Sequence, residues 1–332
     1  MKSPRWKQEA INFWFEAKRI YAPNESPRYA TFSSMKKAIC VICVISLANY
    51  KLKSQDLDPR RYASLPKNMN AVALVYGISH GNVVSDPTLP ISDFTITAQT
   101  IGLGYVRTFG LAGKLSRIAI TVPYTFLSGN LTINGHDTSG VRAGFDDAQI
   151  RFGMNLFGSP AQDRKQFAHF EQKTIFGASL VISVPTGTYH KDKYINTGNN
   201  RWGFKPEIGV SRRFSRFYVE VYTGIWFYTA DNEYLGDQIR KQNPLFSIQA
   251  HGCYYFKNQM WVSLNATLFK GGETYVGNMQ TGISFDNWRI GGTWSLPVAK
   301  GQSIKLQCSA GAFATRGYNY NALSLTYQYV FF

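Results

Sequence analysis

Apolar and polar residues alternate along most of the chain, beginning near Asn70 and continuing to the C-terminus. One clear segment has apolar residues at Met260, Val262, Leu264 and Leu268, with mostly polar or aromatic residues between them. A repeat of two is the pattern of a β-strand with one apolar face, because successive side chains of a strand point to opposite sides. The pattern therefore predicts an all-β domain over residues 70–332.

Twelve segments of this kind can be placed along the domain. An even number of antiparallel strands returns the C-terminus to the side on which the first strand begins, as in bacterial single-chain barrels. The second strand is the least regular, because its apolar phase slips between Thr100 and Ile101, and we expect a bulge there. The predicted strands span residues 70–79, 95–108, 115–127, 146–157, 174–186, 201–213, 217–229, 244–256, 260–270, 286–296, 302–313 and 321–331.

The connections between the predicted strands alternate in length. Those after odd-numbered strands are long, such as 128–145, and most of those after even-numbered strands are very short, such as 214–216 and 257–259. Long outer loops and short periplasmic turns are typical of a transmembrane up-and-down β-barrel. The polar segment 158–173 is the exception, and it predicts one short periplasmic helix that starts near Pro160.

A soluble β-sandwich would show the same alternation, since the pattern does not say whether the apolar face meets lipid or a protein core. The aromatic residues separate the two folds, because they gather at both ends of the strands as two membrane-interface girdles would. Phe109, Phe157, Phe214, Phe217, Phe256 and Phe331 lie beside the short turns, and Phe126, Trp202, Phe227, Phe246 and Trp288 lie beside the long loops. The sequence therefore favours an antiparallel transmembrane barrel.

The N-terminal part has the layout of an exported protein. Residues 38–48 are the only long uninterrupted apolar run, about half as long as a membrane-spanning helix needs to be. The run follows Met35, Lys36 and Lys37 and precedes a polar stretch, which is typical of a secretory signal peptide; a short buried helix is the alternative. We expect an over-extended gene start at 1–34, a signal peptide at 35–54, a periplasmic segment at 55–69 and the barrel at 70–332. The expected location is the outer membrane of a Gram-negative bacterium.

Composition agrees with a strand-rich membrane protein. Aromatic residues make up 15% of the chain and charged residues 17%, against roughly 25% charged residues in soluble domains. The net charge is +16, and residues 1–54 hold ten of the 36 Lys/Arg and three of the 20 Asp/Glu, which leaves +9 on the rest. Because the basic residues are scattered, we expect no nucleic-acid partner, but outer-membrane lipid and lipopolysaccharide. The barrel-assembly machinery is the expected partner during insertion.

The polar positions of the strands should face the lumen, because a charge on the lipid side is costly. Lys205 and Glu207, for example, are two apart and share one face. The charged residues fit either a constriction that orders solutes or a structural network of ion pairs, and the aromatic residues fit either a stacking route for solutes or a plug. The predicted pore-lining residues are Arg151, Lys205, Glu207, Glu220, Tyr222, Trp226, Tyr228, His251, Trp261, Asn265, Phe269, Arg289 and Lys305.

Other candidate chemistry is sparse. Asn196, Asn199, Asn200 and Arg201 precede the sixth strand and could gate the outer mouth, bind lipid head groups or simply form turns. The five histidines lack metal-ligand spacing, and we expect no catalytic residues, no metal and no cofactor. Two alternatives to a channel remain open. One is a barrel-embedded lipid hydrolase, which would need a Ser and a His close together at a strand end, and the other is a structural barrel with a blocked lumen.

Several stretches resemble the family of outer-membrane transporters named for the MetA pathway of phenol degradation. They are Asp86-Pro87-Thr88-Leu89-Pro90, GFDDAQIRFGMNLFGSPA at 144–161, SVPTGTY at 183–189 and, most specifically, NTGNNRWGFKPEIGVSRRF at 196–214. The resemblance covers most of the chain from about Asp56 onward. It implies a channel or transporter for small, hydrophobic or aromatic solutes. The family name comes from genomic context and does not identify phenol as the solute.

Overall fold

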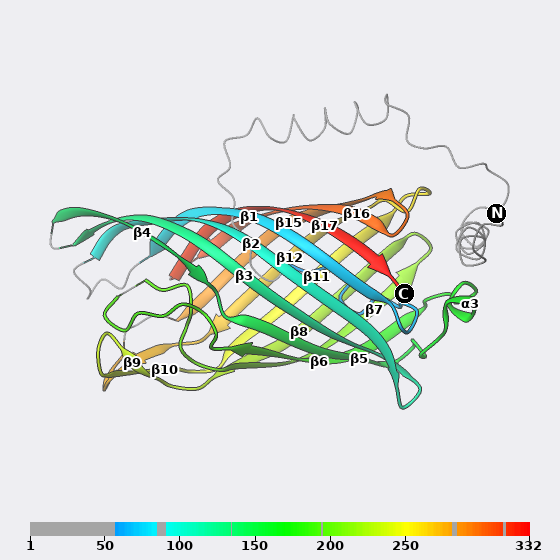
Figure 1. Cartoon of the computed structure of the whole chain (residues 1–332), viewed down its shortest axis with the longest axis horizontal. Coiled ribbons are helices and arrows are strands. Elements are labelled where there is room, and N and C mark those ends of the chain that lie inside the picture. The colour runs from blue at the N-terminus through cyan, green and yellow to red at the C-terminus, as the bar shows by residue number, and fades with distance from the viewer. Residues whose placement is uncertain (1–56, 85–90, 134, 194, 281–283, 315–316) are drawn as a thin grey trace, which may run out of the picture.

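The computed structural model describes residues 57–332 except 85–90, 134, 194, 281–283 and 315–316, and in these residues the chain forms a closed antiparallel barrel of twelve strands (Figure 1). The expected fold class and strand number are confirmed. The barrel strands are β1 (Asn70–Val84), β2 (Ile91–Leu111), β3 (Lys114–Ile133), β4 (His136–Phe145) continued by β5 (Ala148–Phe157), β6 (Thr174–Val184), β7 (Gly203–Phe214), β8 (Phe217–Tyr228), β11 (Leu245–Tyr255), β12 (Trp261–Gly271), β15 (Phe285–Ala299), β16 (Gln302–Ala314) and β17 (Gly317–Phe331).

Each strand pairs with its neighbour in the sequence, and β1 pairs with β17 to close the sheet. Strand β3 pairs with β4 along residues 124–133 and with β5 along residues 116–121. Strands β4 and β5 therefore take one position in the wall together. They are separated only by Asp146 and Asp147. No helix among the described residues is long and apolar enough to cross a membrane.

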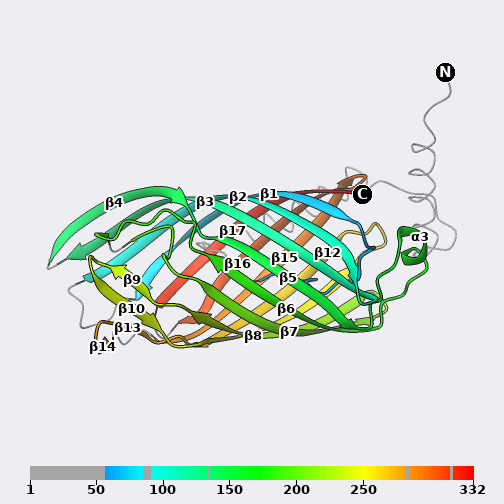
Figure 2. The same ribbon diagram turned by 60° about the horizontal axis from the view of Figure 1, so that its bottom comes forward.

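The two ends of the barrel differ (Figures 1 and 2). The short turns, the C-terminus and helix α3 (Arg164–Phe167) lie at one end, which we call the periplasmic end because short turns face the periplasm in such barrels. The helix is short, as expected, but it begins after Asp163 rather than near Pro160. At the outer end β3 and β4 extend beyond the other strands, and the loops form a second small sheet of β9 (Asp231–Tyr234), β10 (Gln238–Gln242), β13 (Thr274–Val276) and β14 (Met279–Gln280).

The prediction of a bulge between Thr100 and Ile101 is wrong. The register of β2 with β1 runs unbroken through both residues, and the irregularity of β2 against β3 lies between Ser92 and Thr95. The apolar phase changes for another reason: the outward residues of β2 become polar where the strand leaves the apolar band. Gln99 accepts a hydrogen bond from the exposed Tyr76 hydroxyl at 3.1 Å, on this outer surface.

The outer surface is apolar, as lipid contact requires. Leu264, on the outward face of β12, is 78% exposed, and ten of the eleven residues assigned to the two aromatic girdles are exposed as well, Phe109 being half-buried. A soluble sandwich would bury these rings in a core, whereas a barrel places them in the membrane interfaces. The arrangement is therefore that of a membrane-spanning barrel.

Candidate functional site in the barrel lumen

The inner face of the barrel has two unlike sides. On β7, β8, β11 and β12 most inward side chains are fully buried, and we call these four strands the packed wall. On β16, β17, β1, β2, β3 and β5, which we call the open wall, many inward residues are small and partly accessible to water. Thr121 and Gln149 point inward from this wall and are nevertheless exposed. Water therefore reaches the lumen along one side.

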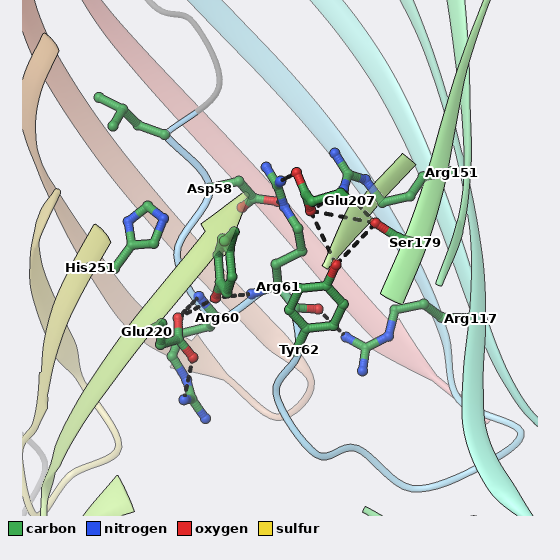
Figure 3. Close-up of polar contacts among 12 residues, drawn as sticks. Asp58, Arg60, Arg61, Tyr62, Arg117, Arg151, Ser179, Glu207, Glu220 and His251 are labelled. Atoms are coloured by element: carbon green, nitrogen blue, oxygen red, sulfur yellow. Dashed lines mark hydrogen bonds and ion pairs between the residues drawn. The ribbon is translucent and has the colours of Figure 1, made fainter. Parts of the chain in front are cut away.

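Residues 57–66 lie inside the barrel and fill the space against the packed wall. We expected a periplasmic segment at 55–69. Lys67 and Asn68 do border the periplasmic turns, through backbone hydrogen bonds to Gln162 and Thr108, but the residues before them run into the lumen. Figure 3 shows the segment passing between His251 on one side and Arg117 and Arg151 on the other.

Arg60 and Glu220 form the first attachment of this segment. The guanidinium Nη1 lies 2.9 Å from Glu220 Oε1, and the backbone N–H of Arg60 donates to Oε2 at 2.6 Å. The same guanidinium lies over the Tyr218 ring, 3.8 Å from its centroid, and donates to the Tyr255 hydroxyl at 3.1 Å. Because Glu220 is fully buried, removing its partner would leave a charge without water, at a cost of about 3–5 kcal/mol.

Glu207 forms the second attachment and is the centre of the network (Figure 3). Its carboxylate pairs with Arg61 at 2.5 Å, Arg151 at 3.2 Å and Lys205 at 3.4 Å, and it accepts a hydrogen bond from the Tyr62 hydroxyl at 3.2 Å. Three cations on one buried carboxylate satisfy its acceptor sites and hold the segment to β5 and β7.

Arg117 on β3 holds the segment from the opposite side. Its two terminal nitrogens donate to the backbone carbonyls of Arg61 at 2.5 Å and Ala63 at 2.8 Å. An arginine that binds carbonyls holds the backbone itself, so this contact does not depend on the side chains of the segment. The segment is therefore fixed from both walls.

Two glycines make room for Tyr62. Gly177 on β6 and Gly209 on β7 are directly paired, and a Cβ at either would lie 2.3 Å from the Tyr62 ring. The ring also meets Tyr222 edge-on at a centroid distance of 5.2 Å. Inward glycines on neighbouring strands are the one sequence feature that could have indicated a chain packed against this wall.

The predicted pore-lining residues all lie on the inner face, but they differ in burial and in their contacts with residues 57–66. Those near the segment belong to the ion-pair network or are buried against it: Arg151, Lys205, Glu207, Glu220, Tyr222 and His251. Trp261, Asn265, Phe269 and Arg289 are also buried, whereas Trp226 and Tyr228, which stack at 5.7 Å, and Lys305 remain partly accessible. Sequence reasoning missed Arg60, Arg61, Tyr62 and Arg117.

Three of the four family motifs meet at the outer mouth, and the fourth, at 86–90, lies outside the described residues. Asp147 accepts hydrogen bonds from the backbone N–H of Gly187 and from both the backbone N–H and the side-chain amide of Asn199, each at 3.0 Å. Gly187 and Gly198 touch backbone to backbone, since a Cβ on Gly187 would lie 2.4 Å from the Gly198 Cα. Segments 144–149, 183–189 and 196–202 thus form one unit, which we call the mouth cluster.

The remaining loop-motif residues complete the mouth cluster. Asn196 caps a turn through its contacts with the backbone of His190 and Lys193. The Asn200 amide donates to the buried Asp231 at 2.9 Å, and Arg201 lies over the Tyr228 ring, 4.4 Å from its centroid. Asn196 therefore has the contacts of a turn-forming residue, whereas Asn199, Asn200 and Arg201 contact other segments of the outer mouth.

Asp146 differs from its neighbour Asp147. It lies between β4 and β5 and accepts a hydrogen bond from the Thr125 hydroxyl at 2.6 Å. Burial raises the pKa of Asp146 to about 6, the Thr125 hydrogen bond opposes this shift, and the adjacent Asp147 charge adds to it. Asp146 is thus readily protonated, while Asp147 carries the contacts that organise the loops.

A lipid hydrolase would need a histidine close to a serine at a strand end. His251 Nδ1 lies 2.8 Å from Asn265 Oδ1 inside the packed wall, out of reach of lipid. On the outer surface His80 Nδ1 lies 2.7 Å from the Thr97 hydroxyl, beside a shallow hollow of about 380 Å³ at the outer ends of β1–β4. This pair has threonine where the alternative of a lipid hydrolase would require serine. Among the described residues no group of three or more His, Cys, Asp or Glu could hold a metal ion.

Residues 75–327 match the family described as the MetA pathway of phenol degradation. The chain belongs to this family. Among solved structures, an outer-membrane channel from Pseudomonas putida F1 is similar over 83% of this chain and all of its own, with 18% identity and a TM-score of 0.65. This likeness shows the barrel fold. The β-domain of the Bordetella autotransporter BrkA also aligns, over 80% of this chain and all of its own, with 12% identity and a TM-score of 0.48. No curated protein matches the chain.

Proposed function

We propose that the protein is a passive outer-membrane channel for small hydrophobic or aromatic solutes, which pass along the open wall beside residues 57–66. The observation that carries this proposal is the exposure of Thr121 and Gln149, two inward residues of the open wall that a filled lumen would bury. The family description, which concerns phenol degradation, and the similar structure, which is an outer-membrane channel, both support it.

The segment sets the width of this route. Because the Arg60–Glu220 and Arg61–Glu207 pairs hold residues 57–66 against the packed wall, only the side near the open wall is left for solutes. Large polar molecules should therefore be excluded, and small flat ones admitted. The network takes a structural role here, in line with the ion-pair alternative considered for Lys205 and Glu207.

The test is single-channel conductance of the refolded protein in planar bilayers, with small aromatic solutes added. We expect a small steady conductance in the wild type and a conductance about twofold or more larger in Glu220→Gln, because the neutral amide holds Arg60 less firmly. Asp163→Asn is the matched control, since its ion pair with Lys67 lies outside the lumen at 3.3 Å.

The outcome separates a channel from the blocked structural barrel. If neither the wild type nor Glu220→Gln conducts while both migrate as folded barrels, the lumen is closed and the channel assignment is wrong. Export completes the proposal: residues 35–54 act as a cleaved signal peptide, the barrel-assembly machinery inserts the chain, and lipopolysaccharide surrounds its outer end. N-terminal sequencing of outer-membrane material should then begin near Gln55.

A further inference from the structure

The charges inside the barrel do not balance. Between the mouth cluster and the periplasmic turns, the described residues include three carboxylates, Asp58, Glu207 and Glu220. Against them stand the five basic side chains of the network (Arg60, Arg61, Arg117, Arg151 and Lys205) together with Arg289 and Lys305. Among the residues that the structure describes, the interior therefore holds seven cations and three anions.

Fixed charge in a narrow water-filled space is neutralised by mobile ions of the opposite sign, and these ions then carry most of the current. An excess of four positive charges in the lumen therefore concentrates anions and repels cations. The ends of the barrel reinforce this sign. The periplasmic end carries Asp163 and Glu171 as its described acidic residues amid eleven Lys/Arg, whereas at the outer end ten described acidic residues outnumber seven Lys/Arg. An anion entering from outside thus moves toward increasingly positive surroundings.

Lys305 is the cation best placed to meet a solute. It points inward from β16 on the open wall, opposite Thr326 in register, and is only half-buried. Its Nζ lies 6.0 Å from the centre of the Trp261 ring. Because Trp261 is buried, a solute that reaches this place meets the accessible ammonium of Lys305, which can pair with its negative group.

We infer that the channel prefers anionic aromatic solutes, namely aromatic carboxylates and phenolates, over neutral or cationic ones, and that Lys305 contributes to this preference. The inference rests on the proposed function, which it deepens by naming the charge of the solute.

The experiment measures reversal potentials in a KCl gradient and, in liposomes, the uptake of benzoate, benzyl alcohol and benzylammonium. The wild type should prefer chloride over potassium and should admit benzoate faster than benzylammonium. Lys305→Glu should lower the anion-to-cation permeability ratio by about threefold or more, and Lys305→Gln by less, because the first changes the fixed charge by two and the second by one.

Lys300→Glu is the matched control. It makes the same charge change five residues away, in the exposed turn between β15 and β16, outside the lumen. An equal effect of Lys300→Glu, or a cation preference in the wild type, overturns the inference. Uptake of benzyl alcohol equal to or faster than benzoate also overturns it while leaving the channel function intact. Uptake of no solute and no conductance would contradict both.

Discussion

At the scale of single residues, the position of Tyr62 depends on two glycines, Gly177 and Gly209, which leave space for its ring because they have no Cβ. Gly209 has no Cβ, and adding one would place it 2.3 Å from the Tyr62 ring and 2.6 Å from the Tyr222 ring. Neither ring can move far, because Tyr62 is held by hydrogen bonds to Ser179 and Glu207. Steric conflict of this kind in a packed interior typically costs about 1–3 kcal/mol.

We therefore expect Gly209→Ala to loosen residues 57–66 from the lumen. The measurement is trypsin cleavage after Arg60 or Arg61, which the barrel shields in the wild type and which should become at least several-fold faster in the variant. Gly102→Ala is the control, since a Cβ there meets only the Val75 Cβ at an ordinary 3.7 Å. Equal cleavage of the two variants would mean that Tyr62 does not hold the segment in place.

Residue-level reasoning from the sequence could assign the side of each strand residue but not its surroundings. Alternation correctly placed Lys205, Glu207 and Glu220 inward, because a two-residue repeat has only two faces. It could not show that residues 57–66 pack against them, since this segment is irregular and lies more than 140 positions from Glu207 and Glu220. The buried carboxylates required cations, and the Arg60-Arg61-Tyr62 sequence supplied them from outside the predicted barrel.

At the scale of elements, the interruption between β4 and β5 organises the outer mouth. Asp147 receives three hydrogen bonds from the two loop segments, and charge-assisted bonds of this kind contribute about 1.5–3 kcal/mol each at most. Three of the motifs that resemble the family lie within 144–214, and this contact joins them in space. No periodic pattern predicts such a contact, because it joins loops.

Asp147→Asn should open the mouth cluster without unfolding the barrel. The amide keeps one acceptor oxygen and places an NH2 group against donors, so the bonds to Gly187 and Asn199 cannot all persist. We expect limited proteolysis within 187–202 to become about tenfold faster, in line with a loss of about 1–2 kcal/mol.

Asp146→Asn is the matched control, because the Asp146 carboxylate accepts a hydrogen bond from Thr125 rather than from the loop segments, and burial raises its pKa to about 6. Proteolysis that increases equally in both variants would show that Asp147 has no special role in the mouth cluster.

At the scale of the whole molecule, the outer face of the barrel could be predicted from the sequence more completely than the lumen. The lipid face is uniform, so alternation and aromatic girdles describe it fully. The lumen is divided into a packed and an open wall, and this division follows from where residues 57–66 lie rather than from any strand. Asn265 illustrates the difference: it faces inward as predicted, but it is buried and bonded to His251, Ser263 and Thr293. An arginine there would meet a filled space, not water.

Charged substitutions should therefore distinguish three environments: the lipid face, the open wall and the packed wall. Leu264→Arg places a charge at the middle of the lipid face, where Leu264 is 78% exposed, and should cost about 2–4 kcal/mol in a membrane-folding assay. Thr121→Arg, on the open wall, should cost much less, because its side chain already faces water inside the barrel. Asn265→Arg should be closer to Leu264→Arg than to Thr121→Arg, since it breaks three buried hydrogen bonds. If Thr121→Arg is as costly as Leu264→Arg, the open wall is not accessible to water, and the route proposed along it cannot carry solutes.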